Sequence, residues 1–389
     1  MDAAAWREAN RVRVKLLYTT LRTLYEALGG PGTFLVAGVR LGGRHGYDED
    51  GAVAPLGGGG VTGLAKSFKR GKPGALVKAV DFPAGRQTAA LADALIEETL
   101  RDPGAVEIGR DGERRWTIGL VESPAASAAA AEAGGRPPQR LGQDSVFVVT
   151  GAAGSIVSAI VQDFAAAYGG TYHLLDLAPE PDPGDPDLAR FTADRADRAD
   201  REDLKRDLFD RLKARGERAT PALVEKELAR IERQHAALEA MRAIQARGGR
   251  AVYHQLDLRD TAAVARAIAT VRDTAGRVDV LLHAAGLEIS RLLPDKSPEE
   301  YDLVFDVKAD GWFNLMSALA GVPLGAAVVF SSIAGRFGNG GQGDYSAAND
   351  LLCKAISGLR RTRPETLASP STGRPGAASA WPPAAPSPS

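Results

Sequence analysis

The sequence predicts an α/β protein with a doubly wound parallel sheet. The first observation behind this prediction is that short apolar runs alternate with amphipathic helical segments, twice along the 389 residues. The second is a glycine-containing turn, TGAAGS at 150–155, which directly follows the apolar run 145–149 and opens an amphipathic segment. A turn of this kind between a strand and a helix is typical of a parallel sheet that binds a nucleotide.

Residues 1–123 predict a small α/β unit of their own. Its first helix covers 11–28, and five apolar residues lie at helical spacing there, which are Val12, Leu16, Leu17, Leu21 and Leu24. The other expected elements are strands at 33–41 and 75–82, helices at 61–70 and 86–101, and a hairpin over 105–121 that turns at Asp111-Gly112. Residues 124–143, which are rich in Ala, Gly and Pro, predict a linker.

Residues 144–366 predict the larger parallel sheet. Its strands are expected at 145–149, 171–175, 251–256, 278–283 and 326–331. The gap between the second and third strands is too long for one crossover helix, so we interpret 180–222 as an insertion, with helices over about 200–214 and 221–247. We favour a hydrated helical hairpin at the edge of the domain, because charged helices usually face water. A dimer contact or an inter-domain contact is the alternative.

Composition and charge exclude several classes of function. A formal net charge of −1 gives no reason to expect nucleic acid or an acidic membrane surface as a partner. No apolar run approaches the roughly 20 residues of a membrane span, and MDAAAWREAN lacks the pattern of a signal peptide. Cys353 is the only cysteine, so no internal disulfide is possible. We expect a cytoplasmic protein with no metal site, no membrane and no nucleic acid.

The turn after the run 145–149 has the features of a dinucleotide-binding loop. Glycines there let backbone N–H groups approach a pyrophosphate, which the positive end of the following helix then holds. Gly151 and Gly154 supply two of the usual three glycines, and Val157 stands in place of the third. A tight turn without a ligand is the alternative interpretation. The candidate cofactor-binding residues of this loop are Thr150, Gly151, Ala153, Gly154, Ser155 and Ile156.

Three further strand ends contribute candidates for the same cofactor. Asp176 closes the second strand at the right distance to accept a hydrogen bond from a ribose hydroxyl, and its carboxylate would repel a 2′-phosphate. That property favours NAD(H) over NADP(H). Asp257 and the adjoining Leu258 end the third strand, where Asp257 could also be a helix N-cap. After the fourth strand, three small residues can pass close beneath the cofactor, namely Ala284, Ala285 and Gly286.

Four residues near the end of the chain are the parts needed to reduce a ketone. Tyr345 is the candidate proton donor, provided that its pKa, near 10 when unperturbed, is brought toward neutrality. Lys308 is the candidate cation that lowers this pKa. Ser332 would bind the substrate carbonyl. Asn349 lies one helical turn after the tyrosine and could position the lysine or a water.

Four stretches together resemble the ketoreductase domains of modular type I polyketide and polyunsaturated fatty acid synthases, within the short-chain dehydrogenase/reductase superfamily. The stretches are TGAAGS, LLHAAG, VFDVKADGWFNL and FSSIAGRFGNGGQGDYSAAND. In that family Asn follows Tyr by four residues and Lys lies upstream, as Asn349, Tyr345 and Lys308 do here. The resemblance covers about 144–366 without the insertion. Residues 1–123 resemble the family's structural subdomain, a truncated Rossmann-like unit without a nucleotide loop.

The resemblance implies an enzyme that reduces a β-ketoacyl chain carried on an acyl carrier protein, beside other synthase domains. It also implies NADP(H) as the usual cofactor, although Asp176 departs from the family's basic residues and keeps NAD(H) open. The family's marks of product stereochemistry are missing, since no Leu-Asp-Asp follows Gly286 and Phe337 stands where one type has Trp. A silent Rossmann scaffold or pseudogene product is the alternative. An epimerase or dehydratase is disfavoured, because their Tyr is followed by Lys.

The last stretch, 367–389, predicts a disordered tail. It is dominated by Pro, Ala and Ser and has no period of a strand or helix. A shifted reading frame of this stretch can encode the strand and lid that the family has next, which leads to the hypothesis of a frameshift near Thr366. Loss of that strand would predict weak cofactor binding and little turnover.

Overall fold

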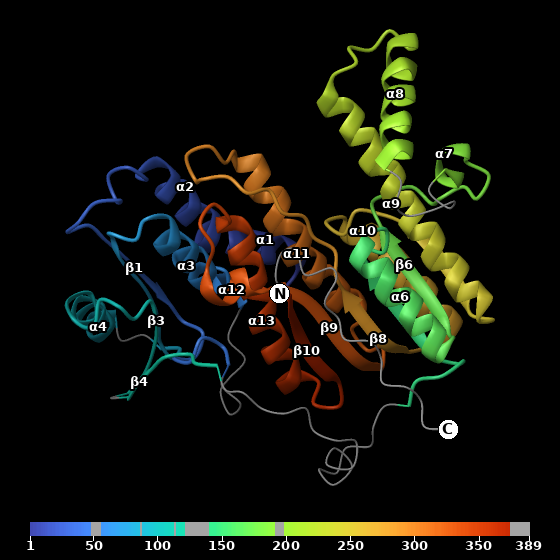
Figure 1. Ribbon diagram of the computed structural model, residues 1–389. Helices are drawn as coiled ribbons and strands as arrows, with labels where there is room; N and C mark the ends of the chain where they lie inside the picture. Colours follow the sequence, from blue (N-terminus) through green and yellow to red (C-terminus); the bar gives the residue numbers. More distant parts are fainter. Residues whose placement is uncertain (48–55, 86–87, 113, 121–139, 191–197, 374–389) are drawn as a thin grey trace. The chain divides into compact units, whose positions relative to one another are not determined.

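The computed structural model describes residues 1–47, 56–85, 88–112, 114–120, 140–190 and 198–373 (Figure 1). The chain forms two compact units. Unit 1 contains residues 1–139, 286–320 and 324–389, and unit 2 contains 140–285 and 321–323. Most of the predicted linker, 124–143, lies outside the described residues. The domains predicted from the sequence, 1–123 and 144–366, were based on the order of motifs along the chain and not on packing. That division stays a prediction.

Unit 1 contains a four-stranded sheet with the strand order β1-β2-β3-β4. The first three strands are parallel, and β3 and β4 pair antiparallel across the predicted turn at Asp111-Gly112. Helix α3 follows β1 and helix α4 follows β2, which confirms the α/β pattern. The bounds are β1 Phe34–Val39, α3 Val61–Gly71, β2 Leu76–Asp81, α4 Thr88–Leu100, β3 Glu107–Asp111 and β4 Arg114–Trp116.

The N-terminal helix begins earlier than predicted and changes its winding on the way. It consists of α1 Ala3–Asn10, a π-helical turn Arg11–Lys15 and α2 Leu16–Thr23. A π-helix holds one more residue per turn than an α-helix, so the buried face shifts along the sequence. Three residues of the predicted apolar face are therefore exposed, namely Val12, Leu16 and Leu24, and the buried face is formed by Trp6, Val14, Tyr18, Leu21 and Tyr25.

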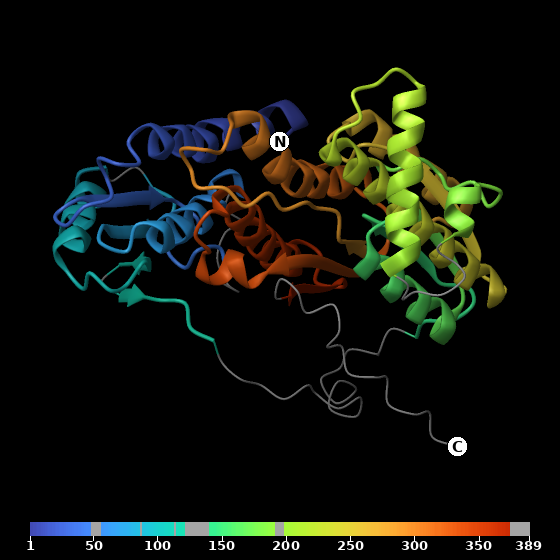
Figure 2. The same cartoon turned by 45° about the horizontal axis from the view of Figure 1, so that its top comes forward.

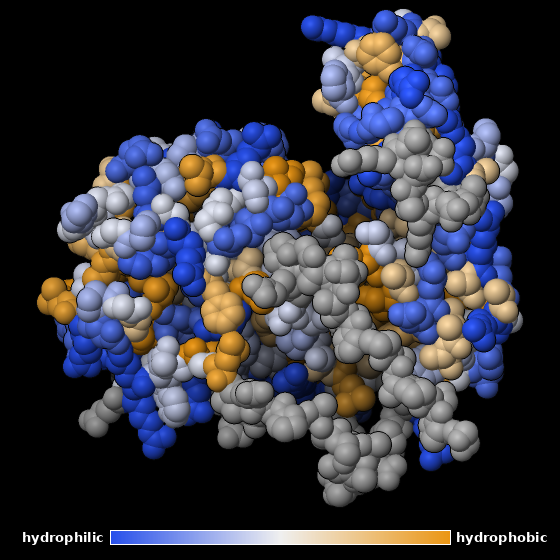
Figure 3. Space-filling model, in the orientation of Figure 1, coloured by the Kyte–Doolittle hydropathy of each residue, from blue (hydrophilic) through white to orange (hydrophobic). Residues whose placement is uncertain are grey.

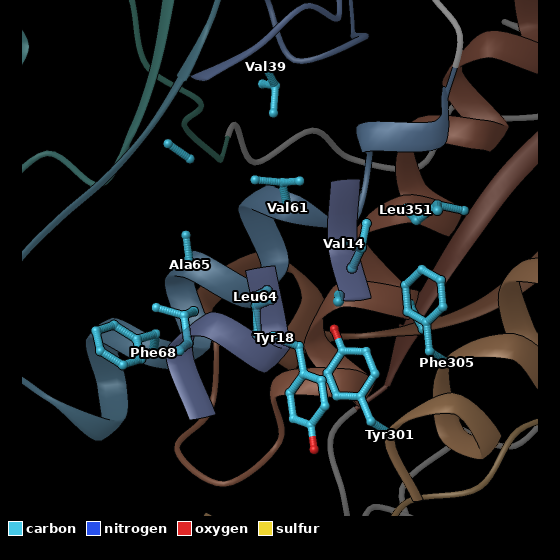
Figure 4. Packing of buried hydrophobic residues seen from close by; sticks show 14 of the residues in the cluster. Val14, Tyr18, Val39, Val61, Leu64, Ala65, Phe68, Tyr301, Phe305 and Leu351 are labelled. Carbon is cyan, nitrogen blue, oxygen red and sulfur yellow. The ribbon is translucent and has the colours of Figure 1, made fainter. Parts of the chain in front are cut away.

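The core of unit 1 joins this N-terminal helix to segments from the end of the chain (Figure 4). The rings of Tyr18 and Tyr301 stack with their centroids 4.0 Å apart. Val14 and Leu64 pack in the same cluster as Phe305. Burial of this apolar area explains why segments so distant in sequence form one unit, because the hydrophobic effect acts on area and not on sequence distance.

The segments that carry the predicted catalytic residues also lie in unit 1. Lys308 is on α11, Ser332 ends β9, and Tyr345 and Asn349 are on α13. The capping box of Ser297 and Glu300 begins α11. The bounds are α11 Pro298–Ala318, β9 Leu324–Ser332, α12 Ile333–Phe337 and α13 Gly343–Thr362.

The prediction of disorder from residue 367 is wrong for its first seven residues. Leu367–Gly373 form β10, which pairs parallel with β9 from Leu367 opposite Ala326 to Gly373 opposite Ser332. Parallel pairing uses backbone groups, and β10 is an edge strand, where Pro370 is tolerated. The hydroxyl of Thr366 also donates to the carbonyl of Leu324 at 2.8 Å. The sheet therefore has its last strand, and residues 374–389 lie outside the described residues.

Unit 2 has four parallel strands in the order β8-β5-β6-β7. All four lie within two residues of their predicted positions. The core strand β5 is completely buried, as its five-residue apolar run predicts. The bounds are β5 Val146–Thr150, α6 Ser155–Tyr168, β6 Thr171–Asp176, β7 Arg250–Gln255, α10 Thr261–Ala275 and β8 Val278–His283.

The insertion forms a helical hairpin, as predicted (Figure 2). It contains a short helix α7 Pro186–Ala189, followed by α8 Arg198–Ala214 and α9 Pro221–Ala246. Leucines of α8 pack on the seam of α9 and form a separate apolar core, whose members include Leu204, Leu208, Leu228 and Ile231. Hydrophilic residues predominate on the hairpin surface seen in Figure 3. This agrees with a hydrated hairpin, while a contact with another chain stays a prediction.

Among the described residues, no helix combines the length and the apolar character needed to cross a membrane. In the same part of the chain, no three His, Cys, Asp or Glu side chains gather as a metal site would require.

Candidate active site

The glycine turn of unit 2 lies directly against the end of β8. Gly151 has φ 70°, and a Cβ there would lie 2.8 Å from the Cα of Ala285. The hydroxyl of Thr150 accepts hydrogen bonds from the N–H groups of Ala284 and Ala285, both at 3.1 Å. The same hydroxyl lies 3.0 Å from Nδ1 of the buried His283. Thr150 thus fixes the loop itself, and His283 is a buried residue packed at the end of β8.

Helix α6 begins at the turn with its first N–H groups unoccupied by a capping side chain. Its N-cap is Gly154, which has no side chain to accept a hydrogen bond. Ser155 and Ile156 in the first turn are exposed. Helix α6 has fourteen residues, and its start is not capped by a side chain. It therefore offers both backbone N–H donors and the positive end of the helix dipole, which suit a phosphate group.

Asp176 closes β6 beside this turn. One carboxylate oxygen accepts from the N–H of Ala153 at 2.9 Å, and the other accepts from the N–H of Ala178 at 2.8 Å. The acid therefore joins the glycine loop to the end of the second strand, where the sequence predicted it. A carboxylate at this place disfavours a phosphate on the ribose by charge repulsion.

Asp257 and Leu258 follow β7 and have other partners. The guanidinium of Arg259 lies 2.7 Å from Asp257, and this hydrogen bonding lowers the pKa of the Asp257 carboxyl below its ordinary value. The N-cap of α10 is Asp260, which excludes the alternative of Asp257 as the helix N-cap, and the role of Asp257 as a cofactor ligand stays a prediction. Leu258 is buried.

The loop and strand ends of unit 2 fit a dinucleotide. A Cβ at Gly151 would fill the space against Ala285, so the turn is built for close approach of backbone. The uncapped start of α6 supplies donors for a pyrophosphate, and Asp176 supplies an acceptor for a ribose hydroxyl. Their roles as cofactor ligands stay a proposal.

In unit 1, Ser332 lies beside the phenol of Tyr345. Ser332 is the N-cap of α12, and its hydroxyl oxygen accepts from the N–H of Ala334 at 3.1 Å. Burial raises the pKa of the Tyr345 phenol above its ordinary value, the hydrogen bond from Ser332 lowers it, and the charge of Glu288 raises it again. A serine that donates to the phenolic oxygen marks the place where a carbonyl oxygen can be held.

Lys308 lies near Tyr345. Its ammonium donates to the carbonyl of Phe330 at 2.7 Å and lies 5.9 Å from the centroid of the tyrosine ring. Burial lowers the pKa of Lys308 to about 8. The pKa of Tyr345 is raised in this structure, chiefly by burial, so the role of Lys308 in bringing the phenol toward neutrality stays a prediction. The cation is desolvated, and it is held by a backbone carbonyl at the end of β9.

Gly286 makes room for the lysine. A Cβ at Gly286 would lie 2.6 Å from Cε and 3.1 Å from Nζ of Lys308. The sequence placed Gly286 with the cofactor loop because it follows an apolar strand. The structure places it against the catalytic lysine, which is a different reason for a small residue at this position.

Asn349 completes the predicted set. Its Nδ2 donates to the backbone carbonyl of Tyr345 at 2.8 Å, so it lies one turn further along the same face of α13. Its Oδ1 is buried, and it has no hydrogen-bond partner in the described part of the chain. A buried acceptor of this kind suits a water or a donor that enters with a ligand.

Two carboxylates beside Tyr345 were not among the predicted site residues. Asp344 precedes it, accepts from the N–H of Tyr345 at 2.8 Å and forms a buried ion pair with Lys296 at 2.7 Å. Glu288 contacts the hydroxyl of Ser290, which accepts from Gln342 at 3.1 Å. The sequence signal for Asp344 was its place in the first helical turn, but its lysine partner is 48 residues away and no spacing rule finds it.

The comparison with known families identifies the chain. The KR domain family matches residues 145–368, more than half of the sequence. The chain belongs to the KR domain family. This confirms the predicted family, and the match extends two residues into the stretch from 367 that we had expected to be disordered.

Relatives of this KR domain are parts of much longer proteins. The polyunsaturated fatty acid synthase of Thraustochytrium sp. has a subunit that is 31% identical over 223 residues, which cover 57% of this chain and 8% of that subunit. Polyketide synthase PksL of Bacillus subtilis is 34% identical over 125 residues, 32% of this chain and 3% of the synthase. The chain therefore spans a small fraction of the length of these curated relatives.

Solved structures share the fold at low sequence identity. A ketoreductase domain from the bacillaene assembly line has a TM-score of 0.65 at 16% identity, and covers 95% of this chain and 72% of its own. A-type ketoreductases from a modular polyketide synthase have a TM-score of 0.61 at 19% identity, with 91% and 61% covered. The Rossmann-like α/β fold with parallel sheets is thereby confirmed.

Proposed function

We propose that this KR domain reduces the ketone of a β-ketoacyl thioester to the β-hydroxyacyl form with NAD(P)H. The observation that carries the proposal is the arrangement in unit 1, where Ser332 is near enough to lower the pKa of Tyr345, Asn349 donates to the backbone carbonyl of Tyr345, and Lys308 lies 5.9 Å from the tyrosine ring. The acyl chain is proposed to arrive on an acyl carrier protein, beside other synthase domains. The synthases to which this chain is similar support that partner.

The bound nicotinamide would supply the hydride that attacks the ketone carbon. The protein's share is the proton and the control of charge on oxygen. The hydroxyl of Ser332 donates to the carbonyl oxygen, and Tyr345 transfers its phenolic proton to that oxygen as charge develops. Lys308, with a pKa of about 8, is mainly protonated at neutral pH, and its field stabilises the phenolate that remains. The products are the β-hydroxyacyl thioester and the oxidised cofactor.

The cofactor is proposed to bind at the glycine turn of unit 2, with its pyrophosphate at the start of α6. KR domains of this family generally use NADPH. Asp176 favours NADH instead, because its carboxylate would face the ribose and repel a 2′-phosphate. We therefore propose that this chain discriminates less against NADH than its relatives do.

The direct test is Tyr345→Phe, assayed on a short β-ketoacyl thioester with NADH and NADPH in parallel. The variant removes one hydroxyl and keeps the ring. We expect kcat to fall by about 10²- to 10⁴-fold, since the general acid is lost. Cofactor affinity should stay unchanged, because Tyr345 is not among the residues of the glycine turn.

Two outcomes contradict the proposal. Equal turnover in wild type and Tyr345→Phe would show that the phenol is not the proton donor. No turnover in the wild type with either cofactor would support a silent scaffold, which was the alternative. The strand β10 removes one of the two reasons for which we had expected weak activity, the loss of a strand, while the expected loss of the lid stays a prediction.

A further inference from the structure

A cluster of charged side chains lies buried behind the helix that carries Tyr345. Asp350 of α13 is its centre and is 1% exposed. Nζ of Lys354 lies 2.8 Å from its carboxylate and Nζ of Lys66 lies 3.4 Å away. The hydroxyl of Thr62 donates to the same carboxylate at 2.5 Å. Lys66 and Thr62 belong to α3, so this carboxylate ties α13 to the N-terminal part of the chain.

The cluster extends to the helix that Ser332 begins. Glu107 of β3 lies 3.5 Å from Lys66 and 2.6 Å from the guanidinium of Arg336. Arg336 is on α12, whose N-cap is Ser332. Ser332 therefore directly precedes α12, and Tyr345 lies on α13. Both of these helices are bound to one buried ionic cluster.

Helices α3 and α13 also touch at their backbones. A Cβ at Gly63 would collide with the carbonyl of Ser346 and would lie 2.8 Å from Cβ of Asp350. The two helices cannot slide past one another here without a clash, and Asp350 is the side chain at the contact. The residue that follows Tyr345 is therefore in contact with α3.

Stability alone does not explain such a cluster. Buried ion pairs are often no more stabilising than apolar residues of the same shape, because both charges lose their water. Buried ion pairs do, however, require particular partners at particular distances. A cluster that joins α3, α12 and α13 through directional contacts restricts the rotation and position of the catalytic helix.

Unit 1 contains a second buried acid that serves as a matched control. Glu98 is 0% exposed and pairs with Arg110 at 2.9 Å, Arg115 at 3.0 Å and Lys78 at 3.7 Å. These partners lie on β2, β3 and β4, and none belongs to α12 or α13. The two acids have the same chemistry and comparable burial, but only Asp350 is on the catalytic helix.

We propose that Asp350 is a positioning residue for the reduction. Its ion pairs with Lys66 and Lys354 fix the turn of α13 that carries Asn349, and thereby hold the Tyr345 hydroxyl on Ser332. This inference rests on the proposed function for its kinetic consequence. It has a separate consequence for the phenol itself, because the hydrogen bond from Ser332 lowers the pKa of Tyr345.

The test compares Asp350→Asn with Glu98→Gln. Both changes remove one buried negative charge and keep the shape, so both should lower the melting temperature. We expect Asp350→Asn to lower kcat by about 10- to 100-fold with KM values within twofold, as expected when a reacting group is misplaced. Glu98→Gln should leave kcat within twofold. Thr62→Val, which removes the hydrogen bonds of this hydroxyl to Asp350 and Lys354 without changing charge, should lower kcat by about three- to tenfold.

The double variant Asp350→Asn/Lys354→Met separates positioning from stability. It removes an ion pair without leaving one charge unpaired, so the melting temperature should recover while kcat stays low. Recovery of both, or an equal loss of kcat in Glu98→Gln, would overturn the inference in favour of a structural role.

A spectroscopic readout makes the test independent of turnover. The pKa of Tyr345 is measured by ultraviolet titration as the difference between each protein and its Tyr345→Phe counterpart. We expect a rise in Asp350→Asn and none in Glu98→Gln. If the wild type reduces no ketone, the proposed function fails, yet this shift still supports the positioning role. An unchanged pKa in Asp350→Asn refutes that role whether or not the wild type is active.

Discussion

The residues proposed for the cofactor and those proposed for catalysis are held in place in different ways. In unit 2 the backbone defines the arrangement, since Gly151 contacts Ala285 and the N–H groups of Ala153 and Ala178 bind Asp176. In unit 1 side chains define it. The ammonium of Lys308 reaches the carbonyl of Phe330, and two buried acids on the helix of Tyr345, Asp344 and Asp350, form ion pairs with lysines from other segments.

Two glycines show the difference most clearly. A methyl group at Gly151 would meet the backbone of Ala285, and the φ of 70° is strained for any other residue. A methyl group at Gly286 would meet the end of the flexible Lys308 side chain, which can move aside. Gly151 is needed for the backbone conformation of the turn, whereas Gly286 is needed for the position of the Lys308 ammonium. Substitutions at the two sites should therefore fail in different ways.

Among the substitutions that compare the two regions, Gly286→Ala is expected to have the largest effect on turnover. The new methyl group pushes Lys308 from its place beside Phe330, while the backbone needs no change, so the melting temperature should fall little. We expect kcat to fall by about 10²-fold, the effect of displacing a catalytic group by about 1 Å. Steady-state kinetics and thermal unfolding check both parts.

The control for Gly286→Ala is Gly38→Ala. A Cβ at Gly38 makes only ordinary contact with Leu95 at 3.5 Å, and it should leave kcat unchanged. A large loss of stability in Gly286→Ala, with normal turnover of the folded fraction, would contradict the division between the two regions.

The sequence predicted the parts of the site that depend on local spacing. The glycine turn, the strand ends and the four-residue step from Tyr345 to Asn349 are all visible along the chain, and the structure has them on the expected elements. Helix α13 also shows its Asp350–Lys354 pair at the spacing of one turn. The other partners of Asp350, Lys66 and Thr62, lie more than 280 residues earlier, and no local rule could connect them.

The sequence-based errors have physical causes of the same type. The π-helical turn Arg11–Lys15 rotates the buried face away from Val12 and Leu16. The prediction placed these residues on the buried face because it assumed a single period for the whole helix. The strand β10 was missed because its residues have low strand propensity. Its pairing depends on the exposed edge of β9, which is a property of the folded sheet.

Gly151→Ala is expected to have the next largest effect, on the cofactor and not on chemistry. The strained φ and the contact with Ala285 should distort the turn, so we expect the KM for the nicotinamide cofactor to rise by at least about tenfold. The control is Gly216→Ala, which has φ 77° and no atom within 4 Å of the new Cβ. It carries the same backbone strain and should leave the cofactor KM unchanged, whereas a similar rise would mean that strain alone is responsible.

The smallest effect concerns His173 of unit 2, whose imidazole is buried with a lowered pKa. Nδ1 of His173 lies 3.0 Å from Nε2 of His254. Burial, followed by the charges of His254 and Arg250, lowers the pKa of His173 from 6.5 to about 4. The unfolded chain therefore binds a proton that the folded chain refuses, so this part of the stability is present above pH 6.5 and is lost as the pH falls.

Acidification from about pH 7.5 to about pH 6 should cost the folded state about 0.8 kcal/mol through His173 alone. His173→Gln removes the titrating group, so its free energy of unfolding should fall less over the same interval than that of the wild type. Denaturant titration of both proteins at the two pH values measures this difference. An equal fall in the free energy of unfolding for both proteins would mean that His173 accepts its proton readily in the folded chain. In that case unit 2 would tolerate a buried charge in the way that unit 1 does, and the contrast between the two units would not extend to their titrating groups.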